Sequence, residues 1–244
     1  MEARPYLREI SLRENAEREQ EYPFSIPAIR RMGTIRFHPD VTFFVGENGT
    51  GKSTLLEAIA LLWGLNPEGG SRNFRFATRA SESELSGSLH MVRSFRRPRD
   101  SFFLRAESFF NLATQVDDLG AADSYGGTSL HEQSHGESFM SLLTERFRGD
   151  GLYILDEPEA ALSPLRQLAM LRRMNQLVRQ NSQFIIATHS PILLGYPDCL
   201  ILQLDDTGLS PIEYERTGHY TMTRRFMNDH AGMLKELFSD DDEV

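Results

Sequence analysis

Gly46-Glu47-Asn48-Gly49-Thr50-Gly51-Lys52-Ser53-Thr54 is the stretch that decides the fold, because it satisfies the pattern GxxxxGK[ST] in full. An apolar run precedes it at residues 41–45, and apolar residues with helical spacing follow it as far as residue 63. The stretch is therefore predicted to be a loop between a strand and a helix. Glycines in such a loop let consecutive backbone N–H groups face phosphate oxygens, and the start of the helix adds a partial positive charge. We expect all nine residues to bind a nucleoside triphosphate.

Two residues of this loop have predicted roles of their own. The ammonium group of Lys52 is expected to reach the β- and γ-phosphates, and the Ser53 hydroxyl is expected to bind Mg²⁺. Of the 26 lysines and arginines in the chain, only Lys52 and Lys235 are lysines. A lysine kept at position 52 in this arginine-rich background indicates a need for a compact point charge.

A second motif follows about 100 residues later. Four apolar residues, 152–155, precede the adjacent carboxylates Asp156 and Glu157. Such a run predicts a buried strand, and Asp156 at its end is placed to hold Mg²⁺ while Glu157 polarises the attacking water. The alternative is a pair of acids on a solvated loop, which the apolar run before them disfavours.

With these motifs the sequence resembles the ABC-type ATPase superfamily, and in overall pattern the short stand-alone predicted ATPases of bacteria. Residues 156–163, Asp-Glu-Pro-Glu-Ala-Ala-Leu-Ser, resemble the Walker B motif and D-loop of that superfamily. Thr188-His189-Ser190 follows the apolar run 184–187, as the switch histidine of the family does. Gln133-Ser134-His135-Gly136-Glu137 resembles a degenerate LSGGQ signature. The resemblance spans residues 30–205.

The resemblance implies an ATPase that uses ATP and Mg²⁺ and works as a homodimer. In the family, ATP is sandwiched between two subunits, so Ser134 and Gly136 would contact the γ-phosphate held by the opposite chain. His189 would contact the same phosphate from the chain that supplies Lys52. Glu157, His189 and Lys52 are therefore the predicted catalytic residues.

The sequence departs from the family pattern at several positions. His135 replaces the first signature glycine, Glu137 replaces the signature glutamine, and Ser163 stands at the D-loop aspartate. These departures leave open a nucleotide-dependent binding module with little turnover. No glutamine marks a Q-loop, and Glu107 stands in that place. It is predicted either to contact the metal with Ser53 and Asp156 or to be a strand-end carboxylate paired with Arg105.

An aromatic residue that stacks on adenine is expected upstream of the phosphate-binding loop. Tyr22 and Phe24 are the candidates, and packing in the core is the alternative for both.

The alternation of apolar runs predicts an α/β fold with a mainly parallel core sheet flanked by helices. We expect an antiparallel β region as well, and one ABC-type ATPase domain over residues 1–244. A short helical insertion at 109–150 would carry the signature, and 239–244 would be an acidic tail. Strands are predicted at 7–13, 32–45, 84–96, 101–106, 152–155, 184–187 and 200–204, helices at 52–63, at 164–180 and within the last 30 residues, and a long loop at 66–84.

Composition excludes several protein classes. The 244 residues include 40% hydrophobic and 25% charged residues, which argues against a disordered or fibrous chain. Cys199 is the only cysteine, so neither a disulfide framework nor a cysteine-built zinc site is available. No apolar run approaches 18 residues, so we expect a soluble cytoplasmic protein without membrane insertion. The ATPase subunit of a transporter would also lack a span, and it remains a weaker alternative.

Basic residues concentrate in one segment of this acidic chain, whose net charge is −9. Residues 71–105 hold eight arginines against three acidic residues, with phenylalanines among them. The segment predicts either contact with nucleic acid phosphates or a solvated face that pairs with acidic residues. Arg72 or Arg75 reaching an ATP phosphate across the dimer is a third reading. The protein partner of the ATPase is not named by the sequence.

Overall fold

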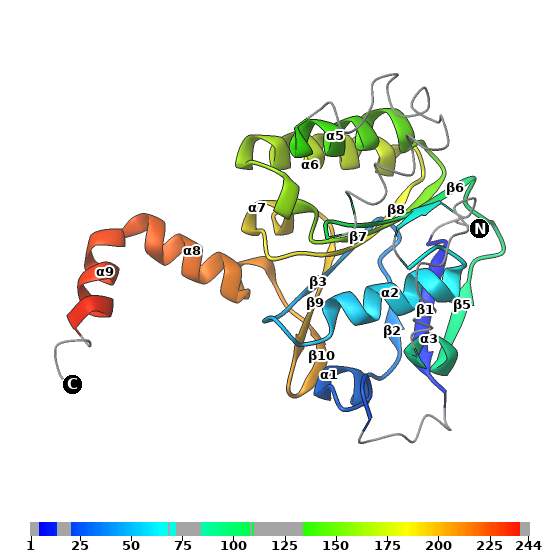
Figure 1. Cartoon of the computed structure of the whole chain (residues 1–244), viewed down its shortest axis with the longest axis horizontal. Helices are drawn as coiled ribbons and strands as arrows, with labels where there is room; N and C mark the ends of the chain where they lie inside the picture. The colour runs from blue at the N-terminus through cyan, green and yellow to red at the C-terminus, as the bar shows by residue number, and fades with distance from the viewer. Residues whose placement is uncertain are drawn as a thin grey trace.

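The structure is a computed structural model that describes residues 5–13, 21–67, 69–71, 84–107, 109 and 134–239. A central sheet has helices on both faces, and a smaller sheet lies beside one of these faces (Figure 1). The predicted α/β class, with a mainly parallel core sheet and an antiparallel region, is confirmed.

The central sheet has seven strands, of which the five in the middle are parallel. The two edge strands run antiparallel to their neighbours. In spatial order the strands are β10 (Gly208–Pro211), β9 (Leu200–Asp205), β3 (Val41–Val45), β8 (Gln183–Ala187), β7 (Gly151–Asp156), β6 (Asp100–Arg105) and β4 (Gly70–Ser71). Parallel strands end at the same edge of the sheet, so the loops after β3, β7 and β8 meet there.

The smaller sheet is antiparallel, with β1 (Leu7–Leu12) between β2 (Ile35–Arg36) and β5 (Leu89–Arg93). A buried glutamine at the start of β8 joins it to the central sheet. The Leu7 N–H donates to Gln183 Oε1 at 3.0 Å, and Gln183 Nε2 donates to the Leu7 carbonyl at 3.0 Å. The glutamine side chain thus satisfies strand groups that would otherwise be buried unpaired.

Helices cover both faces of the central sheet, and side chains that alternate along the strands fill two cores. Phe43 packs into one core and its neighbour Phe44 into the other. On the Phe43 side lie α5 (His135–Ser141), the π-helical turn Leu142–Arg146, α6 (Pro164–Arg179) and α7 (Pro191–Leu194). On the Phe44 side lie α1 (Pro27–Arg30), α2 (Lys52–Trp63) and α3 (Glu84–Ser88).

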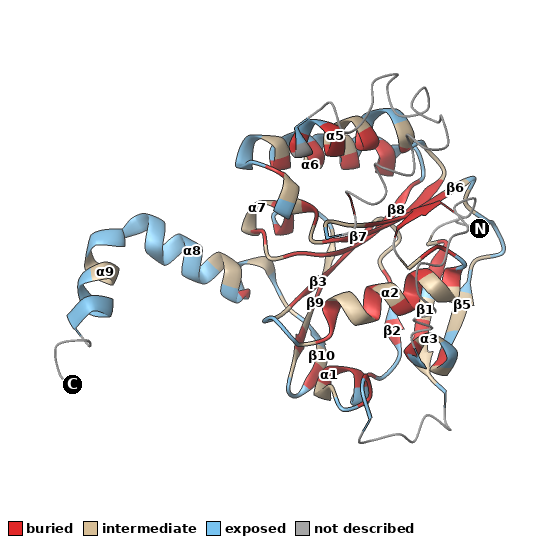
Figure 2. Cartoon of the chain, in the orientation of Figure 1, coloured by how far each residue is buried: buried red, intermediate tan, exposed pale blue. Residues whose placement is uncertain are grey.

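The last described part of the chain is a helical arm that projects from the body (Figure 1). It consists of α8 (Gly218–Asn228) and α9 (His230–Ser239), joined at Asp229, and neither helix buries a residue (Figure 2). The prediction of one helix near the C-terminus is thus corrected to two. Residues 240–244 of the predicted acidic tail lie outside the described residues.

Four expectations about local structure need correction. Residues 84–88 form α3 rather than the start of a strand, because their one leucine, Leu85, is buried in the core shared with α2. The predicted loop at 66–84 contains β4, although most of it lies outside the described residues. On α6, Leu165 and Leu168 are exposed, although the helical spacing placed them in the core. Of the predicted helical insertion at 109–150, residues 109 and 135–146 are helical and residues 147–150 are not, while 110–133 lie outside the described residues.

Within the described part of the chain, no helix has both the length and the apolar character needed to cross a membrane.

Candidate nucleotide-binding site

The predicted site residues that lie far apart in the sequence meet at the carboxyl edge of the central sheet. The phosphate-binding loop follows β3, Asp156 ends β7, and His189 follows β8. Strand β8 lies between β3 and β7, so it carries His189 between the loop and the acidic strand end. The structure therefore brings Lys52, Ser53, Asp156, Glu157 and His189 together, while their roles stay predictions.

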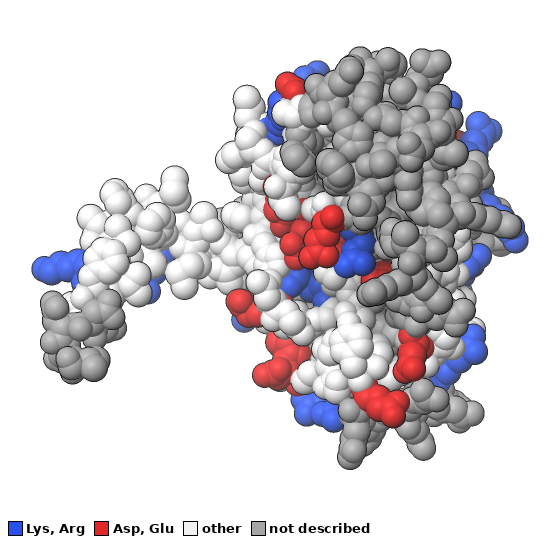
Figure 3. Space-filling view, in the orientation of Figure 1, with Lys and Arg blue, Asp and Glu red and all other residues white. Residues whose placement is uncertain are grey.

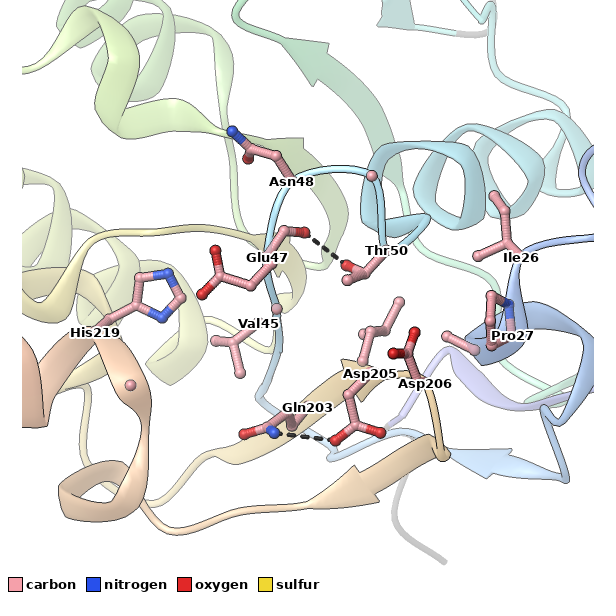
Figure 4. A pocket seen from close by; sticks show the side chains of 15 residues that line it. Ile26, Pro27, Val45, Glu47, Asn48, Thr50, Gln203, Asp205, Asp206 and His219 are labelled. Atoms are coloured by element: carbon pink, nitrogen blue, oxygen red, sulfur yellow. Dashed lines mark hydrogen bonds between the residues drawn. The ribbon is translucent and has the colours of Figure 1, made fainter. Parts of the chain in front are cut away.

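The loop curls because its glycines take backbone conformations that other residues rarely adopt. Gly46, Gly49 and Gly51 have φ values of 153°, 82° and 96°. A Cβ at Gly46 would collide with the Leu204 carbonyl oxygen, so only glycine fits where the loop leaves β3. The Thr50 hydroxyl donates to the Glu47 carbonyl at 2.8 Å and closes the turn (Figure 4).

Lys52 lies inside this curl at the first position of α2. Its Nζ donates to the carbonyls of Gly46 at 2.8 Å and Glu47 at 3.0 Å, and the residue is only 4% exposed. Burial lowers the pKa of Lys52, while the nearby carboxylate of Glu157 opposes that shift. A phosphate would add a direct anionic partner for this buried ammonium group.

Three cavities surround the loop. The first, of about 440 Å³, lies between the loop, α1 and the end of β9, and His219 and Asp205 face it (Figure 4). The second, of about 180 Å³, lies over Lys52 and extends to Tyr22. The third, of about 320 Å³, is lined by Ser53, Asp156 and Glu157, among others. Together they leave room for a nucleotide along the loop and for a metal and water beside Asp156.

Ser53 and Asp156 form the predicted metal site. The Ser53 hydroxyl donates to Asp156 Oδ1 at 3.1 Å. Burial raises the pKa of Asp156 to about 6, and Arg105, whose Nε lies 3.7 Å from Asp156 Oδ2, opposes the shift only in part. No group of three or more metal-ligating side chains converges among the described residues. One hydroxyl and one carboxylate fit Mg²⁺, because this ion usually takes its remaining ligands from phosphates and water.

Glu107 lines the same cavity as Asp156, but its side chain is 88% exposed. Its Oε2 lies 3.5 Å from an Arg105 Nη atom, so the predicted pairing with Arg105 is present. Contact with a metal ion stays a prediction for this residue.

Glu157 follows β7 in a left-handed backbone conformation, with φ of 50°. Its N–H donates to the Ala187 carbonyl at 2.9 Å, which ties the turn to the end of β8. Strained backbone of this kind in a non-glycine residue is typical of functional sites. The Glu157 carboxylate is partly exposed, and its Oε1 lies 3.6 Å from His189 Nε2.

Two residues near His189 were not singled out from the sequence. The carboxylate of half-buried Glu159 accepts the His189 N–H at 2.5 Å, and burial raises the pKa of Glu159. His219 Nε2 lies 2.9 Å from His189 Nδ1. A second acid two residues after Glu157 was a visible signal, whereas nothing in the sequence relates His219 to His189.

The signature residues stand apart from the phosphate-binding loop. Ser134 is the N-cap of α5, as predicted for a loop that ends where a helix begins, and Gly136 is buried beneath the Arg166 side chain. The Glu137 carboxylate accepts the Ser134 N–H at 3.0 Å and its hydroxyl at 2.6 Å, and these bonds lower the pKa of Glu137. Neither Ser134 nor Gly136 lines the three cavities. Within one chain they do not complete the site.

The two aromatic candidates for adenine stacking behave differently. Phe24 is buried in the core with the small sheet, so the core-packing alternative holds for it. Tyr22 is exposed, and its hydroxyl lies 3.0 Å from Thr54 Oγ1 at the end of the loop. Tyr22 therefore remains the candidate for contact with the base.

The described arginines of the basic segment largely contact their own chain. Arg96 and Arg99 both pair with Asp150, and Arg105 pairs with Glu57 at 2.9 Å. Figure 3 shows basic and acidic side chains interspersed on the viewed face. Arg72 and Arg75 lie outside the described residues. Contact of this segment with nucleic acid stays a prediction.

Two family models match the chain. One, described as "AAA domain", matches residues 25–111, and the other, described as "AAA domain, putative AbiEii toxin, Type IV TA system", matches residues 119–195. No curated protein matches it. Among solved structures it is similar to the SMC head domain from Thermotoga maritima, with 14% identity over 86% of this chain and 100% of that chain, and a TM-score of 0.47. It is also similar to an SmcHead bound to the C-winged helix domain of ScpA, with 14% identity over 85% of this chain and 98% of that chain, and a TM-score of 0.47.

The two family models between them cover the phosphate-binding loop, the signature, the acidic strand end and the histidine after β8. These motifs occur in the family's order, and three of them meet at one sheet edge. Residues 25–111 and 119–195 thus each match the model of an AAA domain, and the order of the motifs resembles that of the ABC-type ATPase superfamily.

Proposed function

We propose that the protein binds MgATP and hydrolyses it, and that it acts as an ATP-dependent homodimeric switch on a partner. One observation carries this proposal. The Glu157 carboxylate lies at the sheet edge with His189 on one side and the Ser53–Asp156 pair in the same cavity. This arrangement supports a proposal in which Glu157 acts as the base for water, His189 contacts the γ-phosphate, and Ser53 and Asp156 hold Mg²⁺.

Each residue has a defined part in this reaction. Lys52 and the loop N–H groups hold the β- and γ-phosphates, and Ser53 and Asp156 hold Mg²⁺. The metal neutralises charge that develops on the phosphate oxygens. Glu157 accepts a proton from the attacking water, and His189 donates a hydrogen bond to the γ-phosphate. Tyr22, at the end of the loop, is placed to contact the adenine base.

The proposed homodimer would bring Ser134 and Gly136 to this site, because one chain alone does not place them there. Ser134 and Gly136 begin α5 away from the loop, with Ser134 exposed to solvent. A helix start can bind an anion, so a second copy could offer its α5 to the γ-phosphate. The partner on which the dimer acts is a protein or a nucleic acid, and the basic segment is the place to test for the latter.

ATP turnover tests the proposal directly. Wild-type protein is expected to release phosphate from ATP in Mg²⁺, whereas Glu157→Gln should reduce turnover at least about 100-fold while ATP still binds. Glu145→Gln is the control, because Glu145 is exposed on the π-helical turn, remote from the sheet edge. Wild-type turnover at the level of Glu157→Gln would refute hydrolysis.

A specific observation favours a second candidate, a nucleotide-dependent binding module with little turnover. Glu137 already places a carboxylate at the start of α5, where a phosphate would bind. Tight MgATP binding by wild-type protein without turnover would support this candidate.

A further inference from the structure

His189, which follows β8 at the nucleotide-binding site, contacts His219 at the start of the helical arm. His189 Nδ1 and His219 Nε2 are 2.9 Å apart, so one nitrogen donates a proton and the other accepts it. His219 lies in the first turn of α8, and in Figure 4 its ring and the Glu47 carboxylate point toward each other. The contact therefore connects β8, α8 and the phosphate-binding loop.

The other nitrogen of His189 is buried and has no hydrogen-bond partner among the described residues. It faces the Glu157 carboxylate, whose Oε1 is 3.6 Å away. An unpaired buried nitrogen is costly, and this one points where the proposed γ-phosphate lies. Whether it donates or accepts depends on the tautomer of the ring.

The contact with His219 couples the tautomers of the two rings, because only one of the two facing nitrogens can carry the proton. If His219 Nε2–H donates to His189 Nδ1, the His189 proton sits on Nε2 and can be donated to a carboxylate or phosphate oxygen. In the reverse arrangement, the Nε2 lone pair would face the negative oxygens of Glu157. The first arrangement is favoured electrostatically, because the nearest acceptor groups on that side are anionic.

We propose that His219 is a positioning residue that holds the His189 proton on Nε2, ready to be donated to the γ-phosphate. This inference rests on the proposed ATPase function, because the proton would be donated to ATP. The tautomer itself can be measured without ATP turnover. The orientation of a ring nitrogen by a partner at the opposite nitrogen is a known way to tune histidine sites.

The surroundings keep the pair neutral and its geometry fixed. Burial lowers the pKa of both rings, and Lys52 lowers the pKa of His189 further while Glu157 and Glu47 oppose this. Both histidines are then neutral above pH 7. The start of α8 is held by buried Thr217, whose hydroxyl donates to the Tyr214 carbonyl at 2.7 Å. Because Tyr214 in turn donates to the Pro191 carbonyl at 2.9 Å, His219 is fixed relative to the loop that carries His189.

Ring NMR of the nucleotide-free protein reads the tautomer directly. In wild type at pH 7.5, His189 should carry its proton on Nε2 and none on Nδ1. In His219→Ala the Nδ1-protonated form should become populated, whereas His219→Gln should preserve the wild-type tautomer because its amide N–H can donate in the same place. A proton on Nδ1 in wild type, or an unchanged tautomer in His219→Ala, would overturn the inference.

Kinetics gives a second readout. His219→Ala should lower kcat about tenfold with KM for MgATP changed less than about twofold, and His219→Gln should restore most of kcat. His90→Ala is the control, because His90 is exposed on β5, away from the sheet edge. If wild type shows no turnover, the proposed function fails while NMR still decides the tautomer. If wild type turns over and His219→Ala matches it, the positioning role is wrong.

Discussion

Two helix starts in this molecule, those of α2 and α5, differ in what occupies them. Gly51 is the N-cap of α2, which has no acidic residue in its first turn and no side-chain bond at its cap. Ser134 is the N-cap of α5, which has Glu137 in its first turn, and the Glu137 carboxylate accepts hydrogen bonds from Ser134. One helix start is therefore open to an anion, and the other already holds one.

The difference assigns a separate function to each helix start. The start of α2, with buried Lys52 beside it, is expected to bind a phosphate in the isolated chain. The start of α5 has its carboxylate neutralised by Arg166, whose Nη2 lies 3.3 Å from Glu137 Oε1. In the proposed dimer, a phosphate from a second subunit would displace Glu137, and Arg166 would remain to pair with the phosphate. Dimer formation is thus expected to depend on this local rearrangement.

The largest effect is expected at the open helix start. Lys52→Ala should weaken MgATP binding or turnover by about 1,000-fold, because no other cation replaces the buried ammonium group. Lys52→Arg should fail as well, since a planar guanidinium does not fit between the two loop carbonyls. Lys235→Ala, at the other lysine, is exposed on α9 and should behave as wild type. Calorimetric titration of MgATP measures all three, and wild-type affinity in Lys52→Ala would contradict the assignment.

The next effect concerns the free energy of unfolding that is lost by burying Asp156, the proposed metal ligand. The folded-state pKa of Asp156 is raised from 3.8 to about 6, so the folded protein holds this proton more tightly than the unfolded chain. Stability is therefore lost as pH rises from about 4 to above 6, by up to about 3 kcal/mol. In chelator, Asp156→Asn should be more stable than wild type at pH 8 and similar to it at pH 4.

Thermal unfolding at both pH values measures this difference. The same variant should lose the Mg²⁺ dependence of nucleotide binding, which separates the functional effect from the gain in stability. A variant less stable than wild type at pH 8 would show that Asp156 stabilises the fold as a paired charge.

A smaller effect is expected at the occupied helix start. Glu137→Gln removes the negative charge there and keeps the shape of the side chain. In a Glu157→Gln background with ATP, we expect the dimer dissociation constant to fall about tenfold, because no carboxylate competes with the incoming phosphate. Sedimentation over a range of protein concentrations measures the constant. Weaker dimerisation would indicate that Glu137 itself contributes to the interface.

The smallest effect is local. Ser134→Ala removes the N-cap of α5 and should lower the stability of the nucleotide-free protein by about 1 kcal/mol. Ser134→Gly should cost only a few tenths of a kcal/mol, because glycine tolerates the cap conformation. Thermal unfolding distinguishes the two, and equal losses would mean that the cap bond does not stabilise α5.

The sequence was sufficient for the parts of the fold where local pattern and buried position agree. Strands β7 and β3 could be predicted because their apolar runs are buried on both faces. The helix at 84–88 was missed because a single buried residue, Leu85, gives no periodic pattern. Leu165 and Leu168 had the helical spacing of a core stripe, yet their side chains are exposed in the described part of the chain.

The site was predictable where a motif fixes backbone geometry, and not where the fold alone creates a contact. Lys52, Ser53, Asp156 and His189 could be singled out because each stands at a set distance from a strand end. His219 could not, because the root of α8 reaches His189 only through the path of the chain after β10. Glu137 could be identified as a departure, but its bonds to Ser134 show only in the folded helix.

The central claim is that one ATP site needs two chains, and mixing two inactive variants tests it most directly. Lys52→Ala lacks the phosphate-binding lysine, and Ser134→Arg blocks the start of α5 with a large side chain. Each variant alone is expected to be inactive, and their mixture should recover turnover because a heterodimer has one intact composite site. A mixture that stays inactive while wild type turns over, or full activity of Ser134→Arg alone, would contradict the two-chain site.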